Sequence, residues 1–452
     1  MKPNVFYKVG AWLLLCFSLL SYQQASAQTS RKLTLDEAVQ LGLQNSKQLK
    51  LNQAQIDEAT ASLKEANENR LPDLKLSGSY LRVNNPNIIS HQTKSGTDTS
   101  SGGGSSLSVN SVMYGMATLS LPLYTGGKIK YGIESAKYLA EAAKLDAESN
   151  RDAVIQNTIS AYSNLYKAAK SVELVQQNLD QSRQRDNDFS NMEKNGLLAR
   201  NDLLKAELQT SNIELTLLDA QRNRKMANVN MNLMLGIAED TQLEVDSTGL
   251  DVLPDAKSVV EWEQAANQNR KDIASLATRE KAAASMIKIA KADYLPTIAL
   301  SGGYVAINIP DFYEITNALN IGVGVSYNLA TFWKTGSKVD KAKAQERQVQ
   351  VNREQLDDQV RLQINQAYED YLLARKKIEV YNVAVEQANE NYKITKNKHD
   401  NSLVTTTDLL DANVAQLQAV LNFAFAKADA VVAYKKLLET SGTLNAQYTN
   451  KQ

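Results

Sequence analysis

The sequence of 452 residues has one cysteine, two histidines and no net charge, because 50 basic side chains balance 50 acidic ones. This balance gives no overall field that would attract nucleic acid, so we expect no nucleic-acid partner. Cys16 lies in a segment that we expect to be removed, which excludes disulfides, thiol catalysis and cysteine metal sites from the mature chain. His91 and His399 have no partner pattern for a metal site or a catalytic triad. The sequence therefore predicts neither an enzyme nor a cofactor.

Long hydrophobic runs are also lacking. The apolar run Ala11 to Leu20 is about half of the roughly 20 residues that a membrane-spanning helix requires, and no later run is longer. It follows two lysines and precedes an Ala-Ser-Ala sequence, so residues 1–27 are interpreted as a signal peptide and the mature chain would begin at Gln28. A lipid anchor at Cys16 would normally need a small residue before it, and Leu15 stands there instead. We interpret Cys16 as an ordinary apolar residue of the signal.

Proline is scarce, and it is absent between Pro122 and Pro254 and again after Pro310. Both stretches can therefore hold very long helices, and a helix from Lys128 to Asn195 would extend about 100 Å. Apolar residues in both stretches recur in heptads, which predicts coiled-coil packing. The heptad positions are Val154, Thr158, Ala161, Leu165, Ala168, Val172, Val175 and Leu179, and Val360, Ile364, Ala367, Tyr371, Ala374, Ile378, Tyr381, Val385, Ala388 and Tyr392. Glycine and asparagine predict the turns after Asn195 and Asn401 and the helix ends at Gly236 and Gly442.

The chain is an internal repeat. Residues 71–80 return as 295–304, and further matches follow in the same order. These matches are Gln44-Asn45 with Gln268-Asn269, Ala161-Tyr162 with Ala367-Tyr368, Asp202-Leu203-Leu204 with Asp408-Leu409-Leu410, and Gly236 with Gly442. The second copy is shorter where the first contains the glycine- and serine-rich stretch 95–106, a surface loop by composition. We place the first repeat at 28–252 and the second at 253–452.

Each half begins with a helical segment, Leu35 to about Arg70 and Ser258 to about Ala292, which a proline ends. Strands of alternating pattern follow, with apolar residues on one face and small or polar residues on the other. The apolar positions are Leu74, Leu76, Tyr80, Leu119, Leu121 and Leu123, and Ile298, Leu300, Tyr304, Ile321, Val323, Val325, Tyr327 and Leu329. Each strand has about ten residues, close to the roughly 9 to 11 that cross a bilayer. The alternative is a pair of soluble hairpins that are half buried on a core.

Four strands cannot close a barrel in a membrane, and open edges in lipid would leave unpaired backbone groups that cost several kcal/mol each. Two chains would give eight strands, whose interior side chains fill, whereas three chains would give twelve and leave a lumen. The expected fold is therefore an internally duplicated α+β membrane protein. Four transmembrane strands per chain would form a 12-stranded barrel in a homotrimer, and long helices would continue its wall as a coiled-coil tunnel.

In this order of elements the sequence resembles the TolC-like outer-membrane efflux protein family over nearly all of the mature chain. The motifs that carry the resemblance are Leu121-Pro122-Leu123-Tyr124-Thr125-Gly126-Gly127-Lys128 and Gly196-Leu197-Leu198-Ala199-Arg200-Asn201-Asp202-Leu203-Leu204. The resemblance implies a channel in the outer membrane that extends into the periplasm. It also implies a periplasmic adaptor protein and an inner-membrane transporter as partners, in addition to outer-membrane lipid.

The resemblance further implies a periplasmic entrance at the helical tips. Asp408 and Asp411 match the places of an aspartate pair whose threefold copies narrow the entrance, and six carboxylates near one axis would attract cations and repel anions. The alternative is a pair of solvated acids on a helix surface. The first half has Asp202 but Lys205 at the corresponding places, so Lys205 would bridge to an acid on a neighbouring chain.

Ser402 stands where the family often has glycine, and Val404 replaces a basic residue that often helps to hold the entrance closed. Two further groups of residues are candidates for contacts outside the chain. The first is an apolar tip that an adaptor would grip, as against ordinary packing within the tip: Gly196, Leu197, Leu198, Ser402, Leu403 and Val404. The second is an interfacial aromatic belt just beyond the strands, as against a buried joint: Tyr124, Phe332 and Trp333.

Export of drugs, toxic small molecules or metals is thus the expected function. The outer component of a type I protein secretion system is an alternative within the same class. A secreted coiled-coil structural or adhesion protein without a pore would explain the long helices but not the two pairs of strands at equivalent points.

Overall fold

The computed structural model describes residues 30–84, 109–246, 254–255, 257–310 and 313–449. The expected signal peptide with Cys16, His91 and the stretch 95–106 lie outside the described residues. The chain divides into two compact units, which we call the helical unit (1–52, 147–271 and 357–452) and the sheet unit (53–146 and 272–356). Each unit combines segments from both halves of the sequence, so the repeats are not separate compact bodies.

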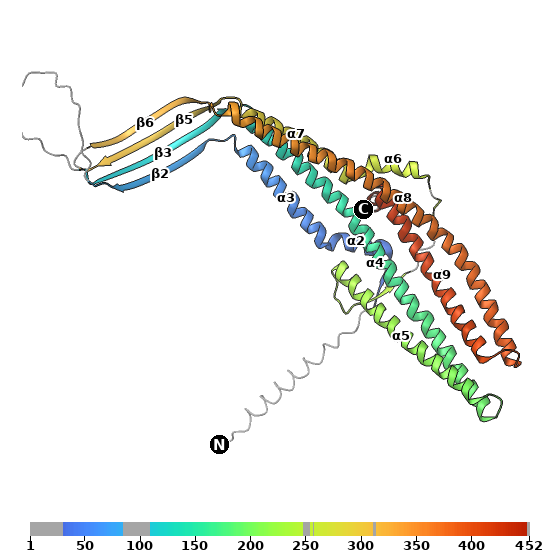
Figure 1. Ribbon diagram of the computed structural model, residues 1–452. Helices are drawn as coiled ribbons and strands as arrows, with labels where there is room; N and C mark the ends of the chain where they lie inside the picture. The colour runs from blue at the N-terminus through green and yellow to red at the C-terminus, as the bar shows by residue number, and fades with distance from the viewer. Residues whose placement is uncertain (1–29, 85–108, 247–253, 256, 311–312, 450–452) are drawn as a thin grey trace, which may run out of the picture. The chain divides into compact units, whose positions relative to one another are not determined.

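The sheet unit contains four antiparallel strands in the order β2 (Asp73–Arg82), β3 (Ser111–Tyr124), β5 (Thr297–Ile309) and β6 (Tyr313–Ser326) (Figure 1). The strands have 10, 14, 13 and 14 residues, so three of them are longer than the sequence predicts. β2 and β6 are the edge strands of this sheet.

The register of the strands separates two kinds of side chain, because directly paired residues lie on the same face of a sheet. Two rows on one face are largely apolar: Leu74, Leu119, Gly302 and Ile321, and Leu76, Ala117, Tyr304 and Leu319. The alternate rows on the other face are polar or small: Asp73, Ser120, Ser301 and Gly322, and Lys75, Thr118, Gly303 and Asn320. In these rows the alternation that the sequence predicts is confirmed across all four strands. Two further rows on the polar face are largely apolar: Ser77, Met116, Val305 and Ala318, and Ser79, Tyr114, Ile307 and Ile315.

The long helices form where the sequence places them. α4 (Lys128–Lys194) leads into α5 (Arg200–Leu235), and α8 (Thr331–Asp400) leads into α9 (Thr406–Thr440). Gly236 ends α5 in the left-handed conformation with φ 67°, and Gly442, with φ 70°, precedes the short helix α10 (Leu444–Thr449). In the helical unit, heptad residues of α4 pack against α5, with Val175 and Leu179 in a buried cluster with Ile213 and Leu217. No helix among the described residues combines the length and the hydropathy that crossing a membrane requires.

The two shorter helical segments are each interrupted, which corrects the prediction of continuous helices. α2 (Leu35–Asn45) and α3 (Lys47–Glu68) meet at Ser46, and α6 (Val259–Asn269) and α7 (Lys271–Ala292) meet at Arg270. The breaks lie at corresponding positions of the two repeats. At the first, Asn45 Nδ2 donates to Leu235 O at 2.7 Å, beside Gly236. At the second, a Cβ on Gly442 would come within 2.8 Å of Arg270 N. The cause of each break is thus a close contact with a helix end far away in sequence.

A small parallel sheet of β1 (Ser30–Leu33) and β4 (Gln242–Val245) was not predicted from the sequence. Tyr162 of α4 lies beneath it, with its hydroxyl 2.9 Å from Leu33 O and 2.7 Å from Asp246 O. Burial raises the pKa of Tyr162 to about 12, so the hydroxyl keeps its proton and can donate to these carbonyls. Strands of four residues carry too little periodicity to be recognised in a sequence.

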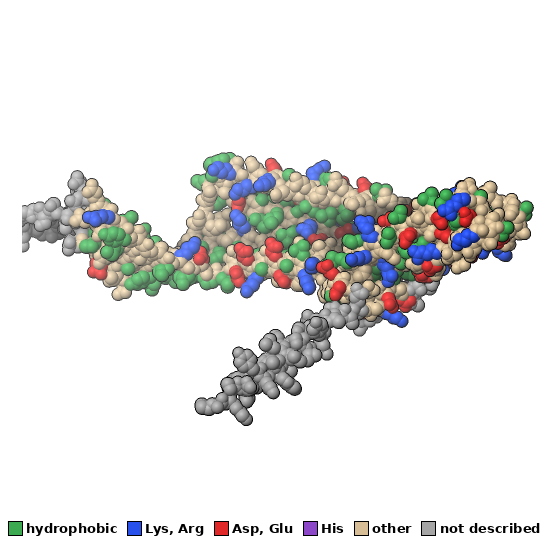
Figure 2. Space-filling view, turned by 90° about the horizontal axis from the view of Figure 1, so that it is seen from below, with side chains coloured by type: hydrophobic (Ala, Val, Ile, Leu, Met, Phe, Trp, Pro, Cys, Tyr) green, Lys and Arg blue, Asp and Glu red, His purple; other side chains and the backbone are tan. Residues whose placement is uncertain are grey.

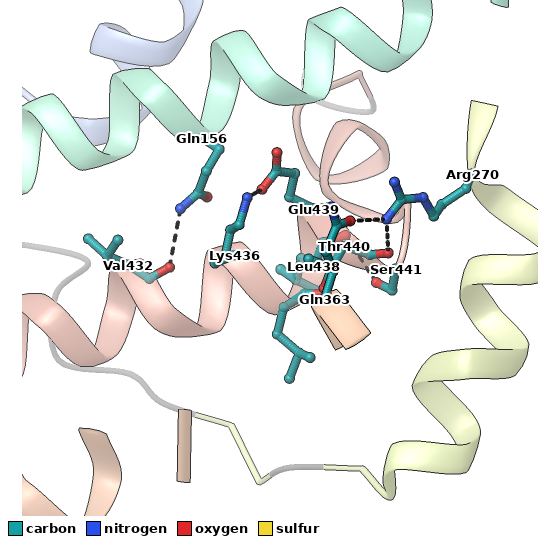
Figure 3. A network of polar contacts seen from close by, with 10 residues as sticks. Gln156, Arg270, Gln363, Val432, Lys436, Leu438, Glu439, Thr440 and Ser441 are labelled. Atoms are coloured by element: carbon teal, nitrogen blue, oxygen red, sulfur yellow. Dashed lines mark hydrogen bonds and ion pairs between the residues drawn. The ribbon is translucent and has the colours of Figure 1, made fainter. Parts of the chain in front are cut away.

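Arg270 connects the second break to the end of α9. Its Nη1 donates to Gln363 Oε1 and to Thr440 O, both at 3.1 Å (Figure 3). Asp152 of α4 is buried nearby, where it accepts a hydrogen bond from the backbone of Asn445. Burial, reinforced by the charge of Glu439, raises the pKa of Asp152 from 3.8 to about 6. Its Oδ1 has no hydrogen-bond partner among the described residues. Keeping this carboxylate ionised therefore weakens the fold.

We predict that Asp152→Asn stabilises the protein at pH 7.5. Because the folded chain binds the Asp152 proton more tightly than the unfolded chain, wild-type stability falls as the pH rises from about 4 through about 6. The difference between 3.8 and about 6 corresponds to roughly 3 kcal/mol as an upper bound. Thermal unfolding in detergent, followed by circular dichroism, should show a gain of several degrees at pH 7.5 that disappears near pH 4. An equal gain at both pH values would contradict this assignment.

Candidate channel entrance and membrane-facing sheet

The two hairpin tips have the same backbone geometry but different residues at the critical position. After α4, Gly196 is left-handed with φ 74°, and Leu197 N donates to Met192 O at 2.8 Å. After α8, Ser402 takes the same conformation with φ 59°, and Leu403 N donates to Lys398 O at 2.8 Å. Residues other than glycine pay a steric penalty in this region because of their Cβ atom. The backbone at Ser402 is therefore strained, whereas the backbone at Gly196 is not.

Each tip presents one largely exposed leucine. Leu197 is 73% exposed and Leu403 is 72% exposed, and they occupy corresponding places in the two repeats. The residues after them, Leu198 and Val404, are half buried. Leu198 packs against a buried cluster of Phe189, Leu203, Ala206 and Leu409, which joins both hairpins. Of the residues predicted for docking, Leu197 and Leu403 are thus free to meet another surface, whereas Leu198 serves internal packing.

Asp408 has a local structural role that the sequence analysis did not assign. It lies in the first turn of α9 and forms a capping box with Thr405. Its Oδ2 accepts from Thr405 N at 2.9 Å and from Thr405 Oγ1 at 2.7 Å, while Asp408 N donates back to Thr405 Oγ1 at 3.2 Å. The hydrogen bond from the Thr405 hydroxyl holds the pKa of Asp408 below its ordinary value. The carboxylate is consequently ionised, exposed and fixed in direction.

Asp411 is also exposed, one turn beyond Asp408, on the side of α9 opposite to the buried Leu409 and Leu410. The structure therefore brings Asp408 and Asp411 onto one solvent-facing side. In the first repeat, Lys205 Nζ lies 3.4 Å from Asp202 Oδ1 in the same helix. Within the chain, Lys205 thus forms an ion pair with Asp202, and the bridge to an acid on a neighbouring chain stays a prediction.

Sequence reasoning missed the environment of His399. The ring is buried at the second tip, stacks on Phe189 with centroids 5.3 Å apart, and places Nε2 3.3 Å from Thr406 Oγ1. Its spacing from Phe189 in the sequence gave no signal, because the contact joins α4 to α8. Among the described residues, no group of three or more histidine and acidic side chains is placed to hold a metal ion.

The predicted aromatic belt is exposed where the strands meet the helices. Trp333 is 69% exposed and Phe332 is 66% exposed, and Tyr124 at the end of β3 is exposed as well. Phe332 contacts Tyr327 edge to face, with centroids 5.9 Å apart. These exposures are those of a single chain, and the interfacial aromatic belt stays a prediction.

One acidic residue connects the helices that begin at the end of the sheet. Asp293, which follows α7, lies 2.8 Å from Lys128 Nζ and 2.6 Å from Lys338 Nζ, so it joins the starts of α4 and α8. Hydrogen bonds from these two lysines keep the pKa of Asp293 low. Gly126 makes close packing here feasible, because a Cβ at this position would lie 2.7 Å from Ala292 O.

A two-faced antiparallel sheet that leads into two very long helical hairpins defines the class of outer-membrane channels. The family model for outer membrane efflux proteins matches residues 38–237 and 262–443, and the chain belongs to this family. The expected fold class and the location in the outer membrane, with an extension into the periplasm, are confirmed. The family and the matched structures are channels rather than enzymes.

Solved structures support the same fold. The outer-membrane channel OprN has 19% sequence identity and a TM-score of 0.74, and the match covers 90% of each chain. The outer membrane protein VceC of Vibrio cholerae has 18% identity and a TM-score of 0.73, covering 90% of this chain and 96% of VceC. The CmeC outer membrane channel of Campylobacter jejuni has 18% identity and a TM-score of 0.75, covering 91% of this chain and 86% of CmeC. No curated protein sequence matches significantly.

We predict that exchanging the residues at the two tips has opposite effects. Ser402→Gly should raise the free energy of unfolding by roughly 0.5–1 kcal/mol, because it removes the left-handed penalty, whereas Gly196→Ser should lower it by a similar amount. Thermal unfolding of the two variants beside wild type measures both changes. A loss of stability in Ser402→Gly would show that the serine side chain makes a contact that outweighs its backbone strain.

Proposed function

We propose that the chain is one subunit of a homotrimeric channel that exports drugs, toxic small molecules or metals. It would act with a periplasmic adaptor and an inner-membrane pump. The observation that carries the proposal is the four-stranded sheet, which has one apolar face, one partly polar face and two unpaired edges, β2 and β6. The family supports efflux across the outer membrane.

The apolar face of the sheet has no cover within the described chain. Leu76 is 86% exposed and Ile321 is 80% exposed, and Figure 2 shows hydrophobic side chains gathered over the strands while charged side chains are mixed over the helices. A monomeric soluble protein rarely exposes such a face, whereas a barrel in lipid requires it. The polar rows around Lys75 and Asn320 would then line the lumen.

The internal repeat supplies the register between neighbouring subunits. By the repeat, β6 corresponds to β3 and β2 corresponds to β5, and β3 pairs with β5 inside the chain. In that pair Ser120 lies opposite Ser301, whose counterparts in the other repeat are Ser326 and Ser77. If the same pairing joins two copies, Ser326 of one subunit lies opposite Ser77 of the next. Three such junctions close twelve strands, which leaves a lumen.

The helical unit has a matching unpartnered surface. α5 presents a stripe of exposed apolar side chains: Leu204, Leu208, Leu215, Leu218, Met226 and Leu233. α8 presents Leu362, Val380, Val383 and Ile394. Spacings close to heptads on both helices suit packing against a helix of another copy. We assign these stripes to the walls of the tunnel, the exposed leucines of the tips to the adaptor, and Asp408 and Asp411 to the entrance.

Cysteine cross-linking tests the proposed closure of the barrel. The only cysteine precedes the expected mature start, so a Ser77→Cys, Ser326→Cys variant adds the only two thiols of the mature chain. Mild oxidation of membranes should give dimers and trimers that dithiothreitol reverses. The matched control is Ser77→Cys with Asn320→Cys, whose second thiol is on the same face but ~20 Å further along β6. Equal cross-linking of the two variants, or only monomers from both, would contradict the proposed closure.

Charge removal at Asp408 and Asp411 tests the proposed entrance. Asp408→Asn with Asp411→Asn removes both charges but keeps an oxygen that can accept the capping hydrogen bond at position 408. In planar bilayers the double variant should keep its trimeric conductance and lose cation selectivity, with block by multivalent cations about tenfold weaker. Asp400→Asn, an exposed acid before the tip, is the control. Unchanged block would discard the gate assignment and keep the channel.

A further inference from the structure

The sheet unit concentrates basic residues at the end of the sheet where the helices begin. Besides the end of α3 (Lys47–Glu68), three helical segments lie there: the start of α4, the end of α7 and the start of α8 (Figure 1). Although the whole chain is electrically balanced, lysines dominate these segments: Lys128, Lys130, Lys137, Lys281, Lys288, Lys291, Lys334, Lys338, Lys341 and Lys343. The acids in or next to these segments are Glu134, Glu280, Asp293 and Asp340, and the end of α3 adds Glu65 and Glu68.

All of these acids except Glu65 have a basic partner among the described residues, with Glu280 paired to Arg353 and Glu68 to Lys64. Asp293 pairs with Lys128 and Lys338, Asp340 lies 3.5 Å from Lys343, and Glu134 lies 3.9 Å from Lys288. The remaining lysines have no carboxylate within ion-pair distance among the described residues: Lys130, Lys137, Lys281, Lys291, Lys334 and Lys341. Because these six lysines outnumber the one unpaired acid, Glu65, the chain does not neutralise the positive charge of this end by itself.

Three of the unpaired lysines lie directly at the junction. Lys130 is in the first turn of α4, Lys334 is in the first turn of α8 and Lys291 is in the last turn of α7. At 1.5 Å per residue, each is within about 5 Å of the helix end that faces the sheet. All three are exposed, and Lys334 directly follows the exposed Phe332 and Trp333. Lysines and aromatic side chains at one level are typical of the headgroup region of a membrane.

The helices themselves strengthen the preference for an anion. An α-helix carries partial positive charge at its N-terminus, so acidic residues are favoured in its first turn. α4 and α8 have no acidic residue in the first turn and carry lysines there instead. This arrangement is unfavourable within the chain and becomes favourable when anions lie beside it.

We propose that Lys130, Lys291 and Lys334 form a basic collar that binds the phosphate groups of anionic phospholipids in the membrane leaflet on the helix side of the sheet. The inference rests on the proposed function, because it needs the sheet to lie in the membrane. In a trimer the collar repeats three times around the barrel. Charge and depth together select phospholipid headgroups as the partner, since only these place phosphates in a ring at the level of the aromatic belt.

The test compares a collar variant, Lys130→Gln with Lys291→Gln and Lys334→Gln, with a control of equal charge, Lys377→Gln with Lys396→Gln and Lys398→Gln. The control lysines are exposed, lie on α8 in the helical unit and have no ion pair among the described residues. Each purified protein is placed in nanodiscs that contain phosphatidylcholine with increasing phosphatidylglycerol. The readout is quenching of tryptophan by brominated phosphatidylglycerol relative to brominated phosphatidylcholine. Trp262 is replaced by phenylalanine throughout, which leaves Trp333 as the sole tryptophan after residue 27.

Wild type and the control should show brominated phosphatidylglycerol enriched next to Trp333 at low salt, and 0.5 M salt should weaken this enrichment. Each lysine near an anionic surface contributes roughly fivefold, so the collar variant should lose most of the enrichment. Equal loss in both triple variants, or no enrichment in wild type, would overturn the collar. Cysteine cross-linking and conductance test the channel independently of lipid binding. If neither shows a trimeric channel, the proposed function is wrong. If both show it but wild type has no preference for phosphatidylglycerol, only the collar proposal is wrong.

Discussion

The structure depends most on the hydrogen bonds that the edge strands do not make within one chain. β2 and β6 each have one neighbour in the sheet, so a row of N–H and C=O groups on each strand is left without a ladder. In hydrocarbon every such group would cost several kcal/mol, which is far more than the few tenths to one kcal/mol of a typical side-chain pair in a sheet. Closure by further copies satisfies all of these groups at once. In the proposed trimer, the apolar outer face, the lumen and the threefold tunnel would all follow from this one requirement.

Internal duplication makes that closure attainable with one interface geometry. β2 with β3 and β5 with β6 have equivalent registers, since Leu74 opposite Leu119 corresponds to Ile298 opposite Val325. The two repeats differ at their hairpin tips. One tip has Gly196 and the internally neutralised Asp202, whereas the other has the strained Ser402 and the exposed acids Asp408 and Asp411. In the proposed trimer, a ring of six subunit halves would thereby alternate between neutral and acidic tips.

Features with a strong local period were predictable from the sequence, and features that depend on distant contacts were not. Alternation placed the strands, and heptads with Gly236 and Gly442 placed the long helices to within a few residues. The breaks at Ser46 and Arg270 escaped because each results from packing against a helix end elsewhere in the chain. At the tip, the chemistry of Asp408 was recognised but its capping box was not, although Thr405 stands three residues before it. Resemblance and charge therefore led to the proposed entrance, while only the geometry shows that the capping box fixes the carboxylate of Asp408.

Packing in the helical unit changes character toward the tips. The apolar cluster at Val175 and Leu179 gives way to a polar layer in which Ser182 Oγ lies 2.7 Å from Thr210 Oγ1 and accepts from Arg185 Nη2 at 2.7 Å. Arg185 Nη1 also donates to Asn413 Oδ1 of α9 at 3.4 Å, while Arg185 Nε has no partner among the described residues. A buried network that is only partly satisfied stabilises less than an apolar layer but tolerates fewer alignments. The layer thus fixes the register of α9 against α4 at little gain in strength. Beyond this layer the Phe189 cluster with Leu203, Ala206 and Leu409 joins both hairpins again, so the polar layer lies between two apolar ones.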